Sequence, residues 1–280
     1  MVVISTETYE QICEFCTKFR GLTIHCEQEL RKFFSHIDPQ VLSAILSKEW
    51  QKHIKQWHHR IARSGADLLR EYKQQSGARG DPFILLQIAT RENFSPVSLC
   101  RILLSMGFEG KPKSVTNEMM KHPYLIPDPL LALNVLNCLH NDKSDGPLTD
   151  LKRQTIGEDY EVRLKKMASD AGLEFHDEVH LRRYGYDKTP DLKLAVPCMY
   201  KGKIINWIES KASFGDMTSH RQYVNDQLSS YGNRFGNGII IYWLGYLDQV
   251  AKCPENKDFI IVTDDFPKKE DLIVLNLPFK

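Results

Sequence analysis

The feature that most constrains the fold is a pair of apolar segments, residues 192–199 and 203–210, on either side of Lys201 and Gly202. Both segments have the texture of β-strands, and a glycine in the short stretch between them is a signal for a tight turn. The sequence therefore predicts a β-hairpin whose side chains alternate between two faces.

The register of this hairpin predicts which charged residues meet at its open end. With the turn centred on Lys201, Asp191 is expected opposite Lys211, and Glu209 opposite Lys193, diagonally next to Asp191. Glu209 and Lys211 are two residues apart, so they share one face of their strand. A bulge would shift the pairing by one residue.

Two carboxylates and one ammonium group thus gather at the end of a strongly apolar hairpin. Charged groups in such a place are costly unless they pair or bind a cation. Carboxylate oxygens suit Mg²⁺, which takes few carboxylates together with waters and substrate phosphate. Asp191, Glu209 and Lys211 are therefore the candidate metal-binding and catalytic residues.

The pattern of the sequence changes near residue 147. Residues 1–147 predict a helical region, with helix starts at Asp38–Pro39 and Ser95–Pro96, and a further subdivision near 76–82 is left open. Residues 141–147, NDKSDGP, predict a linker. Residues 148–280 then show an α/β pattern, with a helix at 158–171 and strands at 192–199, 203–210, 238–244 and 258–263.

Residues 82–107 have the spacing of a helix-turn-helix corner, with helices at 84–92 and from Ser95 to Met106. One interpretation is a corner that docks in a groove of DNA, with Arg101 or Arg91 as a contact. The other is two helices packed in an all-α domain. Both interpretations stay open at this point.

The net charge of +1 means that a nucleic-acid surface must be a local patch. Basic residues, Arg60 and Arg63 among them, recur at near-helical spacing, either as a phosphate-contacting face or as a solvated one. Arg182 and Arg183 lie shortly before the hairpin and are followed by two tyrosines. That loop suits phosphate contact and base stacking, or has no role beyond its polarity.

Seven cysteines, an odd number spread over 280 residues, favour free thiols over a disulfide framework. Cys13 and Cys16 with His25 and Cys26 suggest a zinc site, but the helical spacing around them favours cysteines packed in a core. No apolar run is long enough to span a membrane, and no secretory signal is expected.

Pro190–Asp191 followed by Glu209–Ser210–Lys211 resembles the signature of the PD-(D/E)xK superfamily of restriction-endonuclease-like nucleases. Two further features are similar to that superfamily. Glu161 lies in a helix before the hairpin, and Gln227 with Tyr231 matches the Q-x-x-x-Y element of RecB-like branches. The resemblance implies a core in the order α-β-β-β-α-β within residues 148–280.

The resemblance also implies roles for these residues. Glu161, Asp191, Glu209 and the carbonyl oxygen of Ser210 would bind one or two Mg²⁺ ions, with Mn²⁺ as a substitute. Lys211 would orient or help deprotonate the attacking water, and Gln227 and Tyr231 would position the lysine or the phosphate. The implied reaction is hydrolysis of DNA phosphodiester bonds, selective for a strand or a DNA structure.

Some of these assignments have structural alternatives. Glu161 is otherwise a solvent-facing helix carboxylate, with Glu158 the ligand or no helix ligand at all. Gln227 and Tyr231 are otherwise plain helix residues that pack against the sheet.

The Thr189–Pro190–Asp191 form of the motif and the helical first half are similar to the TPD-type members of this superfamily, vertebrate nucleases that interact with codanin. This resemblance implies codanin as a partner and a nuclear location, with a cytoplasmic one also open. The alternative is a catalytically weak adaptor that binds protein in a chromatin-related complex. Resolvase-like relatives cut as dimers, so a homodimer also stays open.

Overall fold

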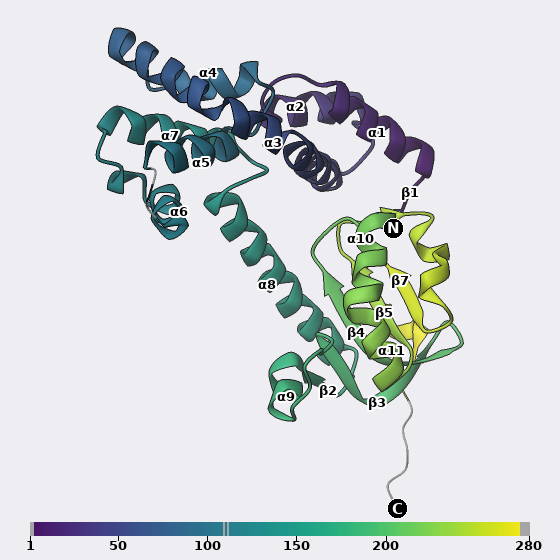
Figure 1. Ribbon diagram of the computed structural model, residues 1–280. Coiled ribbons are helices and arrows are strands. Elements are labelled where there is room, and N and C mark those ends of the chain that lie inside the picture. The colour runs from purple at the N-terminus through teal and green to yellow at the C-terminus, as the bar shows by residue number, and fades with distance from the viewer. Residues whose placement is uncertain (1–2, 109, 111, 275–280) are drawn as a thin grey trace, which may run out of the picture. The chain divides into compact units, whose positions relative to one another are not determined.

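The structure, a computed structural model, describes residues 3–108, 110 and 112–274 of the chain (Figure 1). These residues form two compact units. Residues 11–154 make a helical unit, and the described parts of residues 1–10 and 155–280 make an α/β unit. The helical unit is thus an insertion in the sequence of the α/β unit. No described helix is both long and apolar enough to cross a bilayer.

Some helices of the helical unit begin where a capping residue precedes proline. The Asp38 side chain accepts a hydrogen bond from the backbone of Gln40, and the Ser95 hydroxyl accepts one from the backbone of Ser98. Both predicted helix starts are confirmed. The helices are α1 (Thr6–Lys18, whose first turn belongs to the α/β unit), α2 (Thr23–Phe33), α3 (Pro39–Arg79), α4 (Ile84–Arg91), α5 (Pro96–Gly107), α6 (Lys113–Lys121), η1 (Pro123–Leu125) and α7 (Pro129–Asn141).

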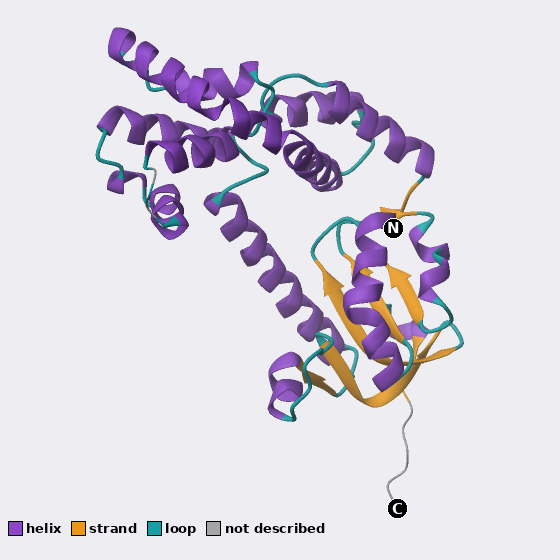
Figure 2. Ribbon diagram, in the orientation of Figure 1, coloured by secondary structure: helices purple, strands orange, loops and turns teal. Residues whose placement is uncertain are grey.

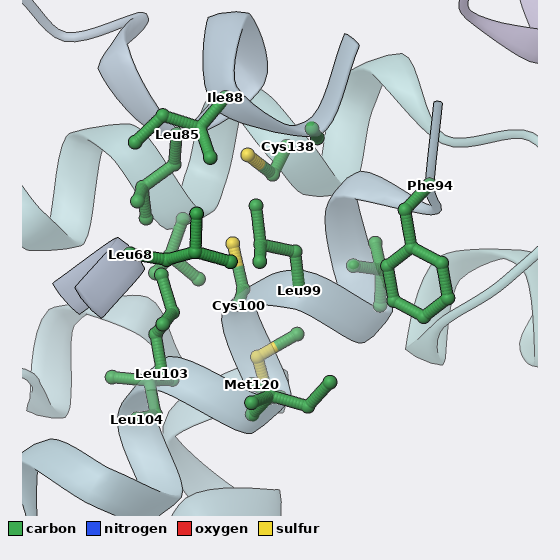
Figure 3. Close-up of a cluster of buried hydrophobic side chains, with 14 of the residues drawn as sticks. Leu68, Leu85, Ile88, Phe94, Leu99, Cys100, Leu103, Leu104, Met120 and Cys138 are labelled. Atoms are coloured by element: carbon green, nitrogen blue, oxygen red, sulfur yellow. The ribbon is translucent and has the colours of Figure 1, made fainter. Parts of the chain in front are cut away.

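One apolar cluster holds α3 to α7 together. Each fully buried aliphatic side chain contributes about 1.5–3 kcal/mol to folding. Between α4 and α5, Asn93 takes a left-handed conformation (φ 50°) and the next residue, Phe94, is buried. The predicted two-helix corner is therefore present. Buried residues of this cluster, drawn in Figure 3, include Leu85, Ile88, Leu99, Cys100, Leu103 and Cys138.

The α/β unit is built on a mixed sheet, so the predicted mixed α/β class is confirmed. Its described strands lie in the order β2-β3-β4-β5-β7, and β8 pairs with β3. The strands β2, β3 and β4 are antiparallel, whereas β4, β5 and β7 are parallel. The bounds are β2 (Phe175–Asp177), β3 (Leu192–Tyr200), β4 (Lys203–Lys211), β5 (Gly238–Tyr242), β7 (Ile260–Thr263) and β8 (Leu272–Val274).

Helices cover this sheet (Figure 2). The long helix α8 (Pro147–Asp170) buries Leu164 and Ala168 in an apolar cluster with Leu192 and Ile208 of the sheet. The segment from α10 (Met217–Tyr223) through the π-helical turn η2 (Val224–Leu228) to α11 (Ser229–Phe235) places Tyr231 against Trp207, with ring centroids 5.4 Å apart. The remaining short helices are α9 (Glu178–Arg183), η3 (Val250–Lys252), η4 (Pro254–Asn256) and η5 (Lys269–Asp271).

The first residues of the chain pair with a late strand. β1 (Val3–Ile4) runs parallel to β6 (Tyr246–Leu247), with Val3 opposite Tyr246. The Thr6 hydroxyl donates a hydrogen bond to the Asp248 carboxylate over 2.9 Å. These contacts tie the start of the chain into the α/β unit.

The predicted hairpin is present, but its predicted register is wrong. The turn consists of Lys201 and Gly202, both with positive φ (50° and 74°), so Tyr200 pairs with Lys203. An irregularity between Lys193 and Cys198 then shifts the pairing, and Lys193 lies opposite Trp207.

This shift changes which charged residues lie opposite each other. Leu192 pairs with Ile208, so Asp191 comes opposite Glu209, and the predicted pairing of Asp191 with Lys211 does not occur. Proline has no N–H to donate to a strand ladder, and Pro197 lies inside the irregular stretch, which gives a physical reason for the bulge.

Candidate active site

The open end of the hairpin brings three predicted site residues into one hydrogen-bonded group. The backbone N–H of Ser210 donates to the Asp191 carboxylate over 2.6 Å, and the backbone N–H of Asp191 donates to Glu209 over 3.3 Å. Lys211 Nζ donates to Glu209 Oε1 over 2.7 Å. The two strands therefore present two carboxylates and one ammonium group side by side.

Burial sets the electrostatics of this group. Glu209 is only 4% exposed. Burial raises the pKa of Asp191 well above its usual value, the nearby Glu209 charge raises it further, and the Ser210 N–H lowers it. Burial also raises the pKa of Glu209, although the Lys211 ammonium opposes that rise. Two desolvated carboxylates that repel each other are stabilised by a cation placed between them.

Two neighbouring carboxylates keep Lys211 in its charged form. Burial alone would lower the pKa of Lys211, but the Glu209 carboxylate, followed by Asp191, raises it above its usual value. The Gln227 Oε1 atom in η2 accepts a hydrogen bond from Lys211 Nζ over 3.2 Å. Tyr223, which sequence reasoning missed, places its ring 4.8 Å from Lys211 Nζ. Its spacing of four residues before Gln227 was the available signal.

Gln227, which accepts the hydrogen bond from Lys211, lies in the π-helical turn η2. Single π turns inside helices are often found at functional sites. Four residues after Gln227, the Tyr231 hydroxyl donates to the Thr189 carbonyl over 2.7 Å. Tyr231 thus fixes the backbone two residues before Asp191, and its described hydrogen bond goes to that backbone.

The residues present fit a divalent cation with few protein ligands. Among the described residues, no three carboxylate, imidazole or thiol side chains are grouped closely enough to hold a metal ion. Glu161 of α8 has no hydrogen bond to this group among the described residues, and its charge raises the pKa of Asp191. The near set is therefore the Asp191 and Glu209 carboxylates, with Ser210, whose carbonyl is the third expected ligand, next to Glu209 on β4. Mg²⁺ accepts such a set, because waters and substrate phosphate complete its shell.

The predicted arginines of the α/β unit lie on α9. Arg182 donates to the Glu178 carboxylate over 2.5 Å and is thereby paired. Arg183 is exposed, and none of the described residues pairs with it. The hydrogen-bonded group around Glu209 contains neither arginine.

The predicted basic residues of the helical unit are partly paired. Arg60 packs over the Trp57 ring at 4.8 Å and lies 3.6 Å from the Glu92 carboxylate. Arg101 lies 3.8 Å from the Asp145 carboxylate. Arg63 is exposed on α3 without a partner among the described residues.

The corner formed by α4 and α5 offers little surface to a DNA groove. A recognition helix needs an exposed face that reaches base edges. Most of α5 is buried, including Val97, Leu99 and Cys100. The contacts within the described residues favour the packed all-α interpretation of this corner.

Comparisons with known proteins give the chain its relatives. Residues 127–266 match the family described as a protein of unknown function with the TPD sequence motif. The chain is 38% identical to CDAN1-interacting nuclease 1 of Xenopus tropicalis, over 98% of this chain and 91% of the frog protein. The mouse protein of that name is 37% identical over 98% of each chain, and the human one is 37% identical over 89% of this chain and 91% of its own. No solved structure matches the chain.

Proposed function

We propose a nuclease function for this chain, which belongs to the TPD sequence-motif family together with the vertebrate proteins named CDAN1-interacting nuclease 1. The predicted resemblance to this family is thus confirmed. The proposed activity is Mg²⁺-dependent hydrolysis of DNA phosphodiester bonds by a PD-(D/E)xK site. The observation that carries it is the buried group of Asp191, Glu209 and Lys211 at the end of one hairpin.

The order of elements supports a restriction-endonuclease-like core. Helix α8 precedes the antiparallel strands β2, β3 and β4. The helical segment from α10 to α11 follows, and β5 then runs parallel to β4. This is the order α-β-β-β-α-β that the motif resemblance implies.

In the proposed mechanism, Asp191, Glu209 and the Ser210 carbonyl hold Mg²⁺, and Mn²⁺ is the substitute. When bound, the ion lowers the pKa of a water and offsets charge on the phosphate. Lys211 donates from its ammonium group toward the phosphate oxygens, where negative charge grows in the transition state. Gln227 keeps that ammonium oriented. Tyr231, through the Thr189 carbonyl, keeps Asp191 in place.

The test is cleavage of labelled single-stranded, duplex, flap and junction DNAs with Mg²⁺ or Mn²⁺. Asp191→Asn keeps the shape of the side chain and is expected to lower the cleavage rate by at least about a hundredfold. Asp226→Asn is the matched control, because Asp226 is an exposed carboxylate one residue before Gln227. Equal trace activity in all three proteins would identify a contaminant and reject the nuclease.

A second candidate function is protein binding, with codanin as the partner and the nucleus as the location. The relatives are named for an interaction with CDAN1. The specific observation in its favour is a set of four exposed leucines in the helical unit, whose spacing of three residues places two on one face of α7 and two on one face of α8. They are Leu133 and Leu136 of α7 and Leu148 and Leu151 at the start of α8.

The adaptor interpretation predicts that these leucines matter for a complex and not for cleavage. Leu133→Lys with Leu151→Lys is expected to abolish co-purification with codanin while DNA cleavage continues. Loss of cleavage alone in Asp191→Asn, with codanin binding intact, would assign the two activities to different parts of the chain.

A further inference from the structure

A hollow of about 710 Å³ lies beside β3 in the α/β unit, and its lining does not include Asp191, Glu209 or Lys211. Sites for small ligands have volumes of about 300–1,000 Å³, so this hollow has room for one nucleotide. The side chains that line it include Tyr186, Asp187, Lys193, Asn206, Arg234 and Phe235.

Two segments distant in sequence build the walls of this hollow and hold each other. The Arg234 guanidinium of α11 pairs with the Asp187 carboxylate over 2.6 Å. The Tyr186 ring lies against the Phe235 ring, with centroids 5.5 Å apart and planes tilted by 57°. The loop before Asp191 is thus fastened to α11, and the hollow is a built feature of the fold.

The hollow lies next to the proposed catalytic carboxylate. Asp191 and Lys193 flank Leu192, which is buried in the cluster with α8. Asp191 is the residue before β3, and two residues of extended chain span about 6.7 Å, so Asp191 and Lys193 lie on one face at about that separation. One extended nucleotide covers such a distance. A phosphate beside Lys193 would therefore neighbour the phosphate that is cut.

We propose that this hollow binds an unpaired nucleotide of the DNA substrate, next to the scissile phosphate. Lys193 is half-buried and has no partner among the described residues, so its ammonium is available to a phosphate. Tyr186 is 39% exposed and lines the hollow, so its ring is within reach of a base that enters it. Aromatic stacking and a nearby cation are the two elements of single-strand binding sites. This inference rests on the proposed nuclease function and names its substrate class.

The chemistry selects against blunt duplex. In a duplex, each base is stacked on its neighbours and cannot reach a protein ring without being extruded, which costs a few kcal/mol. A single strand, an overhang or a flap offers its base at no such cost. The proposed subsite therefore makes unpaired DNA the preferred substrate.

The first test measures binding without metal, by fluorescence anisotropy of a labelled oligothymidylate and a blunt duplex. Tyr186→Ala is expected to weaken binding of the oligothymidylate about tenfold while binding of the duplex stays unchanged. Tyr186→Phe, which keeps the ring, is expected to bind like the natural protein. Tyr184→Ala is the matched control, because Tyr184 is 72% exposed and does not line the hollow.

The second test measures how affinity depends on salt concentration, which detects a phosphate contact made by Lys193. Lys193→Gln is expected to reduce the slope of log affinity for the single strand against log salt by about 0.7. Lys201→Gln, in the exposed hairpin turn, is expected to leave that slope unchanged. A merely structural role for Lys193 would weaken binding without changing the slope.

The outcomes separate this proposal from the proposed nuclease. Equal binding by Tyr186→Ala and the natural protein, or equal losses with single strand and duplex, would overturn the subsite. Cleavage that depends on Asp191 would remain in that case. Conversely, a protein that binds single strands through Tyr186 but shows no Asp191-dependent cleavage would overturn the nuclease and leave the binding site standing.

Discussion

At the scale of single residues, Lys211 is the side chain on which the candidate site is organised. It touches a carboxylate from its own strand, an amide from η2 and an aromatic ring from α10. Each contact removes a rotamer that the flexible lysine would otherwise sample. A fixed ammonium group stabilises a developing charge without reorganisation during the reaction.

The contact between Gln227 and Lys211 is expected to have a measurable effect on kcat. Gln227→Leu removes the oxygen that accepts from Lys211 and is expected to lower kcat about tenfold, with little change in melting temperature. Lys211→Met is expected to lower kcat at least about a hundredfold. Gln222→Leu, at an exposed position of α10, is the control. Equal effects of Gln222→Leu and Gln227→Leu in steady-state cleavage assays would contradict this role.

The stability of the α/β unit is expected to depend on pH through His220. It is fully buried, with Nδ1 2.8 Å from the Tyr242 hydroxyl and Nε2 2.5 Å from Asn256 Oδ1. Burial lowers the pKa of His220 below its usual value, although the Asn256 contact opposes this. The folded state therefore favours neutral histidine, whereas the unfolded chain binds a proton below about pH 6.5.

Stability from this residue is present above that pH and is lost as the pH falls. The melting temperature is expected to be lower at about pH 5.5 than at about pH 7.5, and His220→Gln is expected to reduce the difference. His58→Gln, at an exposed position of α3, is the control. An unchanged pH dependence in His220→Gln would show that other groups cause it.

At the scale of elements, the hairpin decides where the site residues meet, and the conformation of its turn makes Gly202 sensitive to substitution. Gly202 has a φ of 74°. Residues with a Cβ atom adopt this conformation at a cost of about 1–2 kcal/mol. Gly202→Ala is expected to lower the free energy of unfolding of the α/β unit by that amount in urea titrations.

A substitution of a second glycine, Gly157, is a control with the opposite expected change in the free energy of unfolding. Gly157 lies within α8, and a Cβ atom there would meet nothing within 4 Å. Gly157→Ala is expected to raise the free energy of unfolding by about 0.5–1 kcal/mol, since alanine favours the helix. A lower free energy of unfolding in Gly157→Ala would contradict the helix at this position, and an unchanged one in Gly202→Ala would contradict the turn.

The strands of this hairpin were predictable, but their register was not. Apolar runs around a glycine turn located β3 and β4 to within a residue of their ends. The grouping of Glu209 with Lys211 followed from strand alternation alone. The irregular stretch around Pro197 depends on how the two strands pair in three dimensions, which the sequence pattern does not show. The predicted register therefore paired Asp191 with the wrong residue. The π-helical turn carrying Gln227 had no local signal either.

At the scale of the whole molecule, the proposed nuclease combines one unit that carries the candidate site with another that carries a basic helix face. Lys55, Arg63 and Lys73 are exposed on α3, and the described residues supply no partner for them. Each phosphate contact to duplex DNA adds about 0.9 to the slope of log affinity against log salt. The helical unit is therefore a candidate for duplex binding without base readout.

This proposal predicts a salt effect on duplex binding. Changing Lys55, Arg63 and Lys73 to Gln is expected to lower the salt slope by about 0.9 for each contact that is lost. Arg70→Gln is the control, because Arg70 already lies 3.0 Å from the Asp67 carboxylate. An unchanged slope in the triple variant, measured by filter binding, would make this face an ordinary solvated one.

The pairing of β1 with β6 has a consequence for how the protein comes to be folded. Val3 must meet Tyr246, so the contact closes a loop that contains most of the chain. Loop closure costs entropy, and distant pairings form slowly, whereas helical units with local contacts form fast. During synthesis the helical unit can fold before the last strands have left the ribosome. The residues of β1 therefore stay unpaired until β6 has been synthesised, so this part of the α/β unit forms late.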